Sequence, residues 1–159
     1  MIHTPHPKRI SRAGFSMVEM LLTIGIMSLI TSLVVVAISN ASRDASRMVA
    51  RQQQAAVMNA VNAWVNASSR YPDDYADTSL RGKMRSQETI RGTYNSYPTS
   101  LAKFNVIATY LEDSTANHII TTTTNSNKLK SEALSTAKQY LSLPDWVAGS
   151  YPKVDLVSE

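Results

Sequence analysis

Residues 14–38 read GFSMVEMLLTIGIMSLITSLVVVAI, and this stretch decides how the rest of the chain is organised. From Phe15 to Ile38 its 24 residues include no Lys, Arg, His or Asp and a single acidic residue, Glu19. About 20 apolar residues in a helix are enough to cross the hydrocarbon core of a bilayer. An ionised side chain in that core costs at least about 2.5–3.5 kcal/mol. The segment is therefore predicted to be a membrane helix in which Glu19 needs a partner or a function.

A short basic leader precedes this segment. It carries Lys8, Arg9 and Arg12, and Gly14 then interrupts the chain directly ahead of Phe15. Because positive flanks of a membrane helix stay on the cytoplasmic side, we expect most of the chain to lie on the other side of the inner membrane.

The order of these features resembles the N-terminal segment of type IV prepilins and of type II secretion pseudopilins. The resemblance rests on the basic leader, Gly14, Phe15, the carboxylate at Glu19 and the apolar run, and it ends near residue 50. It implies that a prepilin peptidase cleaves after Gly14 and that Phe15, the new N-terminus, is N-methylated. It also implies that Glu19 serves subunit assembly by pairing with the α-amine of Phe15 in the preceding subunit.

Two features depart from the family pattern. Many pilins and pseudopilins have a helix-bending proline about two-thirds of the way along the apolar run, where this chain has Val35, Val36 and Ala37. Many type IV pilins also close a C-terminal loop with a disulfide bond, which this chain cannot form because it has no cysteine.

Two other interpretations of the N-terminus stay open. A secretory signal peptide has an apolar region of about 7–15 residues and a small-x-small cleavage site. Ala37-Ile38-Ser39 would serve as that site and leave Asn40 as the N-terminus, but the apolar run is longer than such a region. An ordinary signal anchor is the second alternative, with Glu19 reaching toward the lipid headgroups.

The helix is predicted to continue beyond the apolar run, since no Gly or Pro occurs between Ile26 and Tyr71. Apolar residues recur at helical spacing in its second part and should pack on a globular domain. This stripe consists of Ala50, Val57, Val61 and Trp64, and the opposite face carries Arg43, Arg47, Arg51 and Gln54. A helix that is bare in its first half and packed in its second resembles the pilin architecture.

The basic residues outside the leader allow several interpretations. The formal charge of +4 falls to +1 without the leader, because 13 Lys and Arg then face 12 Asp and Glu. Arg43, Arg47 and Arg51 fit a solvated face or, in a filament, the acidic residues of a neighbouring subunit at Asp73, Asp74 or Asp77. Arg43 and Arg47 also fit a position near lipid headgroups. The best candidates for phosphate contacts with DNA are Arg81, Lys83, Arg85 and Arg91, but acidic neighbours dilute them and we expect no nucleic-acid partner.

The remaining sequence predicts short elements. Residues 67–97 read as a long loop with one short helix near Gln87, and Tyr97-Pro98-Thr99 should open a helix that ends at Glu112-Asp113-Ser114. This tripeptide is also similar to one in major pseudopilins. The β-branched run from His118 to Thr124 predicts a strand. A helix is expected from Leu129 to Leu143, with one or two short strands in the tail.

We find no catalytic constellation in the sequence. The histidines are His3, His6 and His118, without metal-ligand spacing, and no glycine-rich phosphate loop occurs. Asp145 and Asp155 are the candidate calcium ligands by similarity to major pseudopilins. The tail has no dense loop of Asp, Asn and Gly to supply the 6–8 oxygens that calcium takes. We therefore expect neither an enzyme nor a bound cofactor.

Together these observations predict an α+β protein. Its parts are a leader (1–14), a transmembrane and assembly helix (15–38), a continuation packed on the head (39–66) and a periplasmic globular domain (67–159). The expected function is that of a filament subunit, first a type II secretion pseudopilin and alternatively a type IV pilus subunit for adhesion, motility or DNA uptake. A plain membrane-anchored periplasmic protein is the remaining alternative. The expected partners are the prepilin peptidase, other subunits, the inner-membrane assembly platform and the bilayer.

Overall fold

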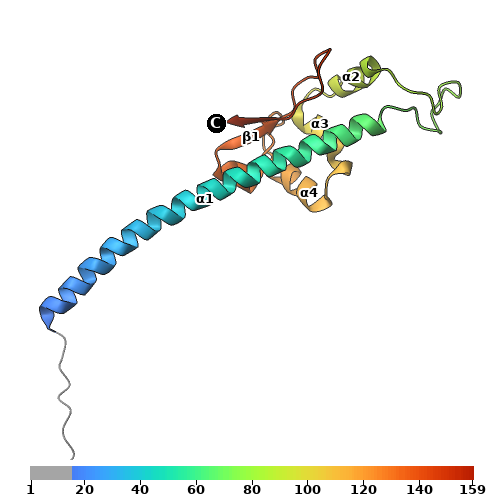
Figure 1. The fold of residues 1–159 in the computed structure, drawn as a ribbon. Coiled ribbons are helices and arrows are strands. Elements are labelled where there is room, and N and C mark those ends of the chain that lie inside the picture. The colour runs from blue at the N-terminus through green and yellow to red at the C-terminus, as the bar shows by residue number, and fades with distance from the viewer. Residues whose placement is uncertain (1–15) are drawn as a thin grey trace, which may run out of the picture. The chain divides into compact units, whose positions relative to one another are not determined.

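The computed structural model describes residues 16–159. Their elements follow one another in the order α1 (Met17–Ala67), α2 (Gln87–Asn95), α3 (Ser100–Ile107), the 3₁₀ turn η1 (Ala108–Tyr110), α4 (Asp113–Thr122), α5 (Glu132–Thr136), β1 (Gln139–Ser142) and β2 (Asp155–Ser158) (Figure 1). A long apolar helix, further helices and a two-stranded antiparallel sheet agree with the predicted α+β layout. The chain divides into two compact units after Asn40, a boundary that lies within α1.

In the described part of the first unit, the helical residues are those of the apolar half of α1, residues 17–40. Each large apolar side chain between Met17 and Ile38 is exposed by 47–81%. By length and composition this helix could cross a membrane.

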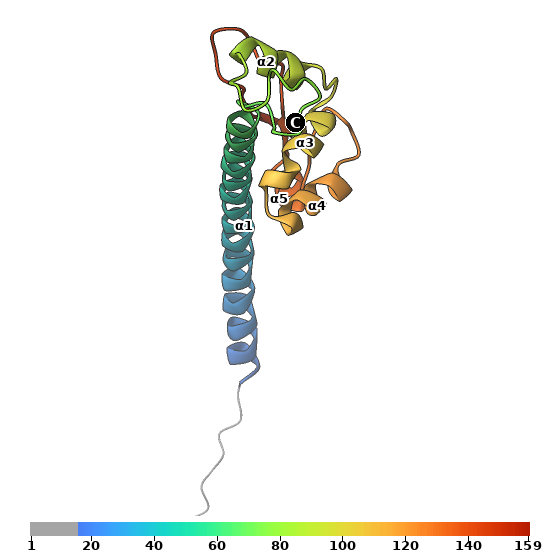
Figure 2. The same ribbon diagram turned by 90° about the vertical axis from the view of Figure 1, so that its right-hand side faces the viewer.

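The second unit forms around the packed half of α1, residues 41–67. The short helices α3, α4 and α5 lie along one side of this half, as the second ribbon view shows (Figure 2). The predicted stripe of Ala50, Val57, Val61 and Trp64 is buried, together with Ala60 and Val65. Burying apolar side chains against the other elements is the main force that holds this unit together.

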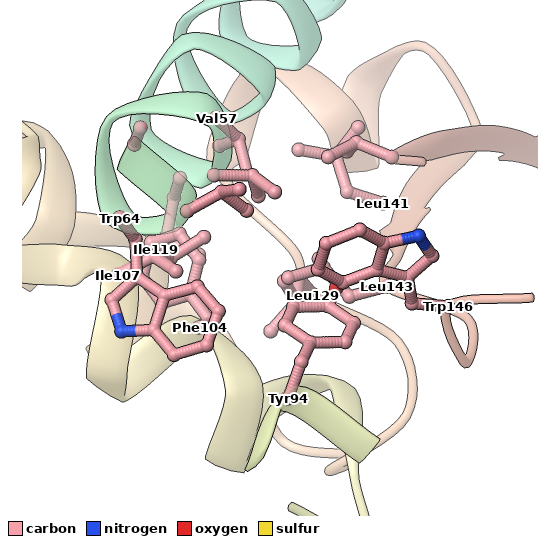
Figure 3. Close-up of a cluster of buried hydrophobic side chains, with 14 of the residues drawn as sticks. Val57, Trp64, Tyr94, Phe104, Ile107, Ile119, Leu129, Leu141, Leu143 and Trp146 are labelled. Atoms are coloured by element: carbon pink, nitrogen blue, oxygen red, sulfur yellow. The ribbon is translucent and has the colours of Figure 1, made fainter. Parts of the chain in front are cut away.

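Aromatic and leucine side chains fill the space opposite the stripe (Figure 3). Tyr94 of α2 lies between two tryptophans, with its ring centroid 5.8 Å from that of Trp64 and 6.4 Å from that of Trp146. The other members come from α2 to α5, from β1 and from the segments beside them: Ile90, Phe104, Ile107, Ile119, Leu129, Leu134, Leu141, Leu143 and Val154.

The short helices α2 and α3 agree with the sequence predictions. Both begin at hydroxyl caps, because Ser86 Oγ accepts from the backbone N–H of Thr89 and Thr99 Oγ1 accepts from that of Ala102. Such caps satisfy donors that a helix start leaves without partners. The end of α3 differs from the prediction: it stops at Ile107, and η1 leads into α4.

The predicted strand at His118–Thr124 is wrong, because residues 113–122 form α4. The hydroxyls of Thr121, Thr122 and Thr123 each donate to a backbone carbonyl four residues earlier, at 2.6–2.8 Å. These local bonds let a threonine run continue a helix. The burial follows a helical repeat, with Ala116 and Ile119 inside.

The predicted helix at Leu129–Leu143 is also wrong over most of its length. Only α5 is helical, and it ends where Lys138 takes a left-handed conformation with φ +54°. Strand β1 then pairs with β2 from Gln139↔Ser158 to Ser142↔Asp155, which supplies the strand expected in the tail. Leu141 also exchanges backbone hydrogen bonds with Leu129, at 2.9 and 3.0 Å.

The helical assignment of α4 predicts unequal effects of two substitutions that lie two residues apart. Ile119→Ala should lower the free energy of unfolding by about 2–5 kcal/mol because it empties a buried site. Thr121→Ala should change it by less than about 0.5 kcal/mol, since Thr121 is exposed. In a strand the two side chains would share one face.

The measurement is a urea titration of the full chain in detergent micelles, followed by the fluorescence of Trp64 and Trp146, which are both buried. Similar losses for the two variants would show that residues 118–124 form a strand after all.

Candidate functional site

The candidate assembly site lies at the start of α1. Gly14 and Phe15, the predicted cleavage and methylation residues, and the leader charges Lys8, Arg9 and Arg12 lie outside the described residues. Ser16 Oγ accepts from the backbone N–H of Glu19 at 3.2 Å, and the Ser16 carbonyl accepts from the N–H of Met20 at 3.1 Å. These bonds start the helix at the point where the resemblance places the mature N-terminus.

Glu19 occupies the first turn of α1 and is exposed. A carboxylate is favoured there because the unpaired backbone N–H groups give a helix start a partial positive charge. None of the ion pairs among residues 16–159 includes Glu19. Residues 16–42 contain no other charged side chain, so an opposite charge for Glu19 has to come from outside that range or from another chain.

Four hydroxyl side chains of the apolar half are satisfied within the helix. The hydroxyls of Thr23, Ser28, Thr31 and Ser32 donate to backbone carbonyls three or four residues earlier, at 2.7–2.9 Å. Ser28, Thr31 and Ser32 also line a shallow groove along the helix with Ile24, Met27 and Val35. Small side chains of this kind let two membrane helices approach closely.

The rest of the apolar half exposes a continuous hydrophobic surface. Soluble monomers rarely expose contiguous apolar patches larger than a few hundred Å², and larger ones mark contacts with a membrane or a partner. The exposed side chains include Leu21, Leu22, Leu29, Leu33 and Val35, each by 61–66%. This half of α1 is therefore built for contact with lipid or with other apolar helices.

In the second unit, side chains of α2 and α3 fix the segment that follows β1. Asn95 pairs with Trp146 in both directions, its Nδ2 donating to the carbonyl at 3.1 Å and its Oδ1 accepting from the N–H at 2.8 Å. Ser100 Oγ accepts from the N–H of Leu143 at 3.0 Å. These polar bonds hold the tail in a chain that has no cysteine for a disulfide.

Lys103 also binds this segment. Its side chain is 3% exposed, and Nζ donates to the Leu143 carbonyl at 3.2 Å and to Asp145 Oδ1 at 2.5 Å. The ammonium also lies 5.1 Å from the centroid of the Tyr94 ring, within reach of a cation–π interaction. No local pattern indicates this role, because a lysine between Leu101 and Phe104 is typical of the exposed face of an amphipathic helix.

The two candidate calcium ligands, Asp145 and Asp155, contact other parts of the protein. Asp145 accepts from Lys103, and Asp155 begins β2 opposite Ser142. Within residues 16–159 no group of three or more His, Cys, Asp or Glu side chains is arranged to hold a metal. His118 Nε2 instead accepts from the N–H of Glu132, over 3.4 Å.

Three of the four basic residues considered for DNA binding make contacts with neighbouring residues of the same chain. Arg81 Nε donates to the Tyr75 carbonyl at 2.7 Å, and the Arg85 guanidinium lies 5.1 Å from the centroid of the Tyr71 ring. Arg91 approaches Glu88 at 3.9 Å, and Lys83 is exposed. Of these contacts, the approach of Arg91 to Glu88 is the one that offsets a positive charge.

The three acidic residues considered as partners of the arginines lie exposed in the loop after α1. They are Asp73, Asp74 and Asp77. The hydroxyl and the backbone N–H of Ser79 both donate to Asp77 Oδ1, at 2.7 and 2.9 Å, and these bonds lower the pKa of that carboxyl. Asp77 is therefore held in its charged form.

The predicted solvent face of the packed half of α1 needs one correction. Arg43, Arg47 and Arg51 are exposed as expected, but Gln54 is half-buried and its Nε2 donates to the Val154 carbonyl at 2.7 Å. Gln54 lies three residues before Val57, so it belongs to the buried side of the helix. Its neighbour Gln53 accepts from Ser131 Oγ at 2.7 Å.

Comparison of the chain with models of known protein families, with curated proteins and with solved structures finds no match.

The buried Tyr94 predicts a pH-dependent stability. Its hydroxyl is buried without a hydrogen-bond partner, and burial, followed by the charge of Asp145, raises the pKa of the phenol. Because the folded-state pKa is above the unfolded value of about 10, the contribution of the neutral phenol is complete below pH 10 and is lost as the pH rises further. Tyr94→Phe should remove this alkaline loss and raise the free energy of unfolding at pH 7 by about 1 kcal/mol.

Urea titrations of the wild type and of Tyr94→Phe between pH 7 and 11 would measure both effects. Tyr140→Phe is the matched control, because Tyr140 is only half-buried. Equal alkaline destabilisation of Tyr94→Phe and the wild type would contradict the account of the phenol.

Proposed function

We propose that this chain is a structural subunit of a pilin-like filament, in the first place a pseudopilin of a type II secretion system. The observation that carries the proposal is an exposed apolar helix of membrane length whose single charge, Glu19, lies in its first turn directly after the Gly14-Phe15 junction. An enzymatic role is not part of this proposal; the chain is instead the substrate of a prepilin peptidase.

In this mechanism the apolar half of α1 is inserted in the bilayer before the subunit assembles. The leader charges keep the N-terminus on the cytoplasmic side, and the second unit lies in the periplasm. Cleavage after Gly14 frees the α-amine of Phe15, which becomes the positive charge nearest to Glu19 in sequence. Phe15 and Glu19 are four residues apart in the sequence, a separation that corresponds to about 6 Å along the axis of a helix.

Assembly then pairs the two charges between subunits. Each subunit offers both an amine and a carboxylate, so the Phe15 amine of one subunit can meet the Glu19 carboxylate of the next. A head-to-tail contact of this kind does not close on itself and can propagate as a helical filament. Removing one partner from a buried ion pair typically costs about 3–5 kcal/mol, so an apolar bundle would reject subunits out of register.

The secretion role is preferred over the pilus role on two grounds. The chain has no cysteine, and Thr99 caps α3 within the Tyr97-Pro98-Thr99 segment that is similar to major pseudopilins. The alternative role in a type IV pilus uses the same N-terminal mechanism. The two roles are therefore separated by phenotype.

The first prediction from this proposal is proteolytic processing. The intact mass of the protein extracted from membranes should correspond to a chain that begins at Phe15 with one added methyl group, because a prepilin peptidase removes the leader. Gly14→Leu should keep the leader, and Ala13→Leu is the matched control beside the junction. An unprocessed wild-type chain, or one that begins at Asn40, would contradict the proposal.

The second prediction concerns Glu19→Leu. This variant should stay in the membrane fraction after carbonate extraction, because it removes a charge from the apolar segment. Its share in sheared filaments should fall at least tenfold, since about 1.4 kcal/mol of lost pairing already gives that factor. Met20→Leu, also exposed in the same turn, is the control. Normal incorporation of Glu19→Leu would overturn the proposed role of the carboxylate.

The phenotype of the same variant distinguishes the secretion role from the type IV pilus role. In cells without the wild-type gene, Glu19→Leu should leave exported enzymes in the periplasm, while twitching and DNA transformation stay normal. Lost transformation with normal secretion would favour the type IV pilus alternative.

A further inference from the structure

Three cationic residues line a small cavity in the second unit. Arg43 and Arg47 come from the packed half of α1, and Lys138 comes with Thr136 and Ala137 from the turn after α5; the cavity measures about 150 Å³. None of these five lining residues is acidic. The cavity therefore brings together cationic residues from two distant parts of the sequence.

The nearby carboxylates leave most of this charge uncompensated. Asp44 approaches Arg47 at 3.5 Å, and both side chains are largely exposed. The backbone N–H of Glu159 donates to the Lys138 carbonyl at 2.9 Å, but its carboxylate pairs with Lys130 at 2.6 Å. Among residues 16–159, neither Arg43 nor Lys138 takes part in an ion pair.

Lys138 adds a second, independent observation. It is the single residue other than glycine with positive φ in the described part of the chain. At the end of a helix this conformation is usually taken by glycine or asparagine, which avoid the steric cost of a longer side chain. A lysine therefore occupies this turn at a steric cost that glycine would avoid.

The sequence places the two arginines close to the end of the apolar run. Arg43 follows Ile38 by five residues and Arg47 by nine, about 7 and 13 Å along a helix. The headgroup layer of a bilayer begins where the hydrocarbon core ends and is about 5–7 Å thick. Side chains of a helix tilt toward its N-terminus, so both arginines lean back toward that layer.

We propose that this cavity, formed by Arg43, Arg47 and Lys138, binds the phosphate of an anionic phospholipid headgroup. The inference rests on the membrane insertion that the proposed function includes, but not on assembly into a filament. The bound headgroup fixes the second unit against the membrane surface before assembly.

The test uses the full processed chain in nanodiscs of phosphatidylcholine, with and without phosphatidylglycerol. Thermal unfolding is followed by the fluorescence of Trp64 and Trp146, and bound lipid is quantified by mass spectrometry. Phosphatidylglycerol should raise the Tm of the wild type, because a ligand of the folded state stabilises it. Its enrichment around the protein should fall about fivefold for each of the three cations removed.

The variants are Arg43→Gln with Arg47→Gln, and Lys138→Gly, which removes the charge and suits the positive φ. Combined, they should abolish the Tm shift while the protein still folds. Arg51→Gln is the matched control: it removes an exposed charge from the same helix one turn further on, away from the cavity. This control should keep the full shift.

Three results would overturn the inference. They are a wild-type Tm that does not depend on phosphatidylglycerol, a shift that survives in the combined variant, and a shift that Arg51→Gln also loses. An equal Tm shift caused by inorganic phosphate in phosphatidylcholine nanodiscs would assign the site to free phosphate and would refute the proposed binding of a lipid headgroup. Carbonate extraction separates the two proposals, since a chain that is not membrane-inserted contradicts the proposed function itself.

Discussion

The apolar half of α1 has no cover within the described part of its own chain, and the rest of the account depends on this constraint. Its large apolar side chains are exposed between Met17 and Ile38, while its hydroxyls are bonded to its own backbone. Such a surface is stable in lipid or among other apolar helices, and costly in water. In the proposed mechanism the helix lies first in lipid and later among the apolar helices of other subunits. Glu19 finds an oppositely charged partner only in the second of these environments.

Apart from its part of α1, the second unit is built from short helices and short strands. Its sheet has two strands of four residues each, and its helices other than α1 have five to ten residues. Short helices and isolated hairpins are marginal alone, so the stripe from Ala50 to Val65 supplies the common surface on which they pack. Polar ties from Asn95, Ser100 and Lys103 then fix the tail.

The features predicted well from the sequence depend on local rules. The long helix follows from the absence of Gly and Pro, its buried stripe from the apolar spacing, and the start of α3 from the proline and threonine that precede it. The candidate assembly residues Gly14, Phe15 and Glu19 also form one local pattern, although the structure describes only Glu19. All of these inferences need only neighbouring residues.

The failures came where distant contacts or local hydrogen bonds decide the outcome. Strand β1 exists because residues 155–158 and Leu129 pair with it, and helical spacing alone could not reveal this. The threonine run joined α4 because its hydroxyls bond to the helix backbone. Gln54 could have been placed correctly, since it lies on the stripe of Val57, but its polarity suggested solvent. Nothing local indicates that Lys138 lies beside Arg43 and Arg47.

Site-directed labelling tests the central claim, that the apolar half of α1 lies in the membrane and the second unit outside it. The chain has no cysteine, so Ser28→Cys and Ser126→Cys each introduce a single reporter. In intact spheroplasts, a membrane-impermeant maleimide should label position 126 fully and leave position 28 unlabelled until detergent is added. Labelling of position 28 without detergent, or of position 126 only after lysis, would contradict the account.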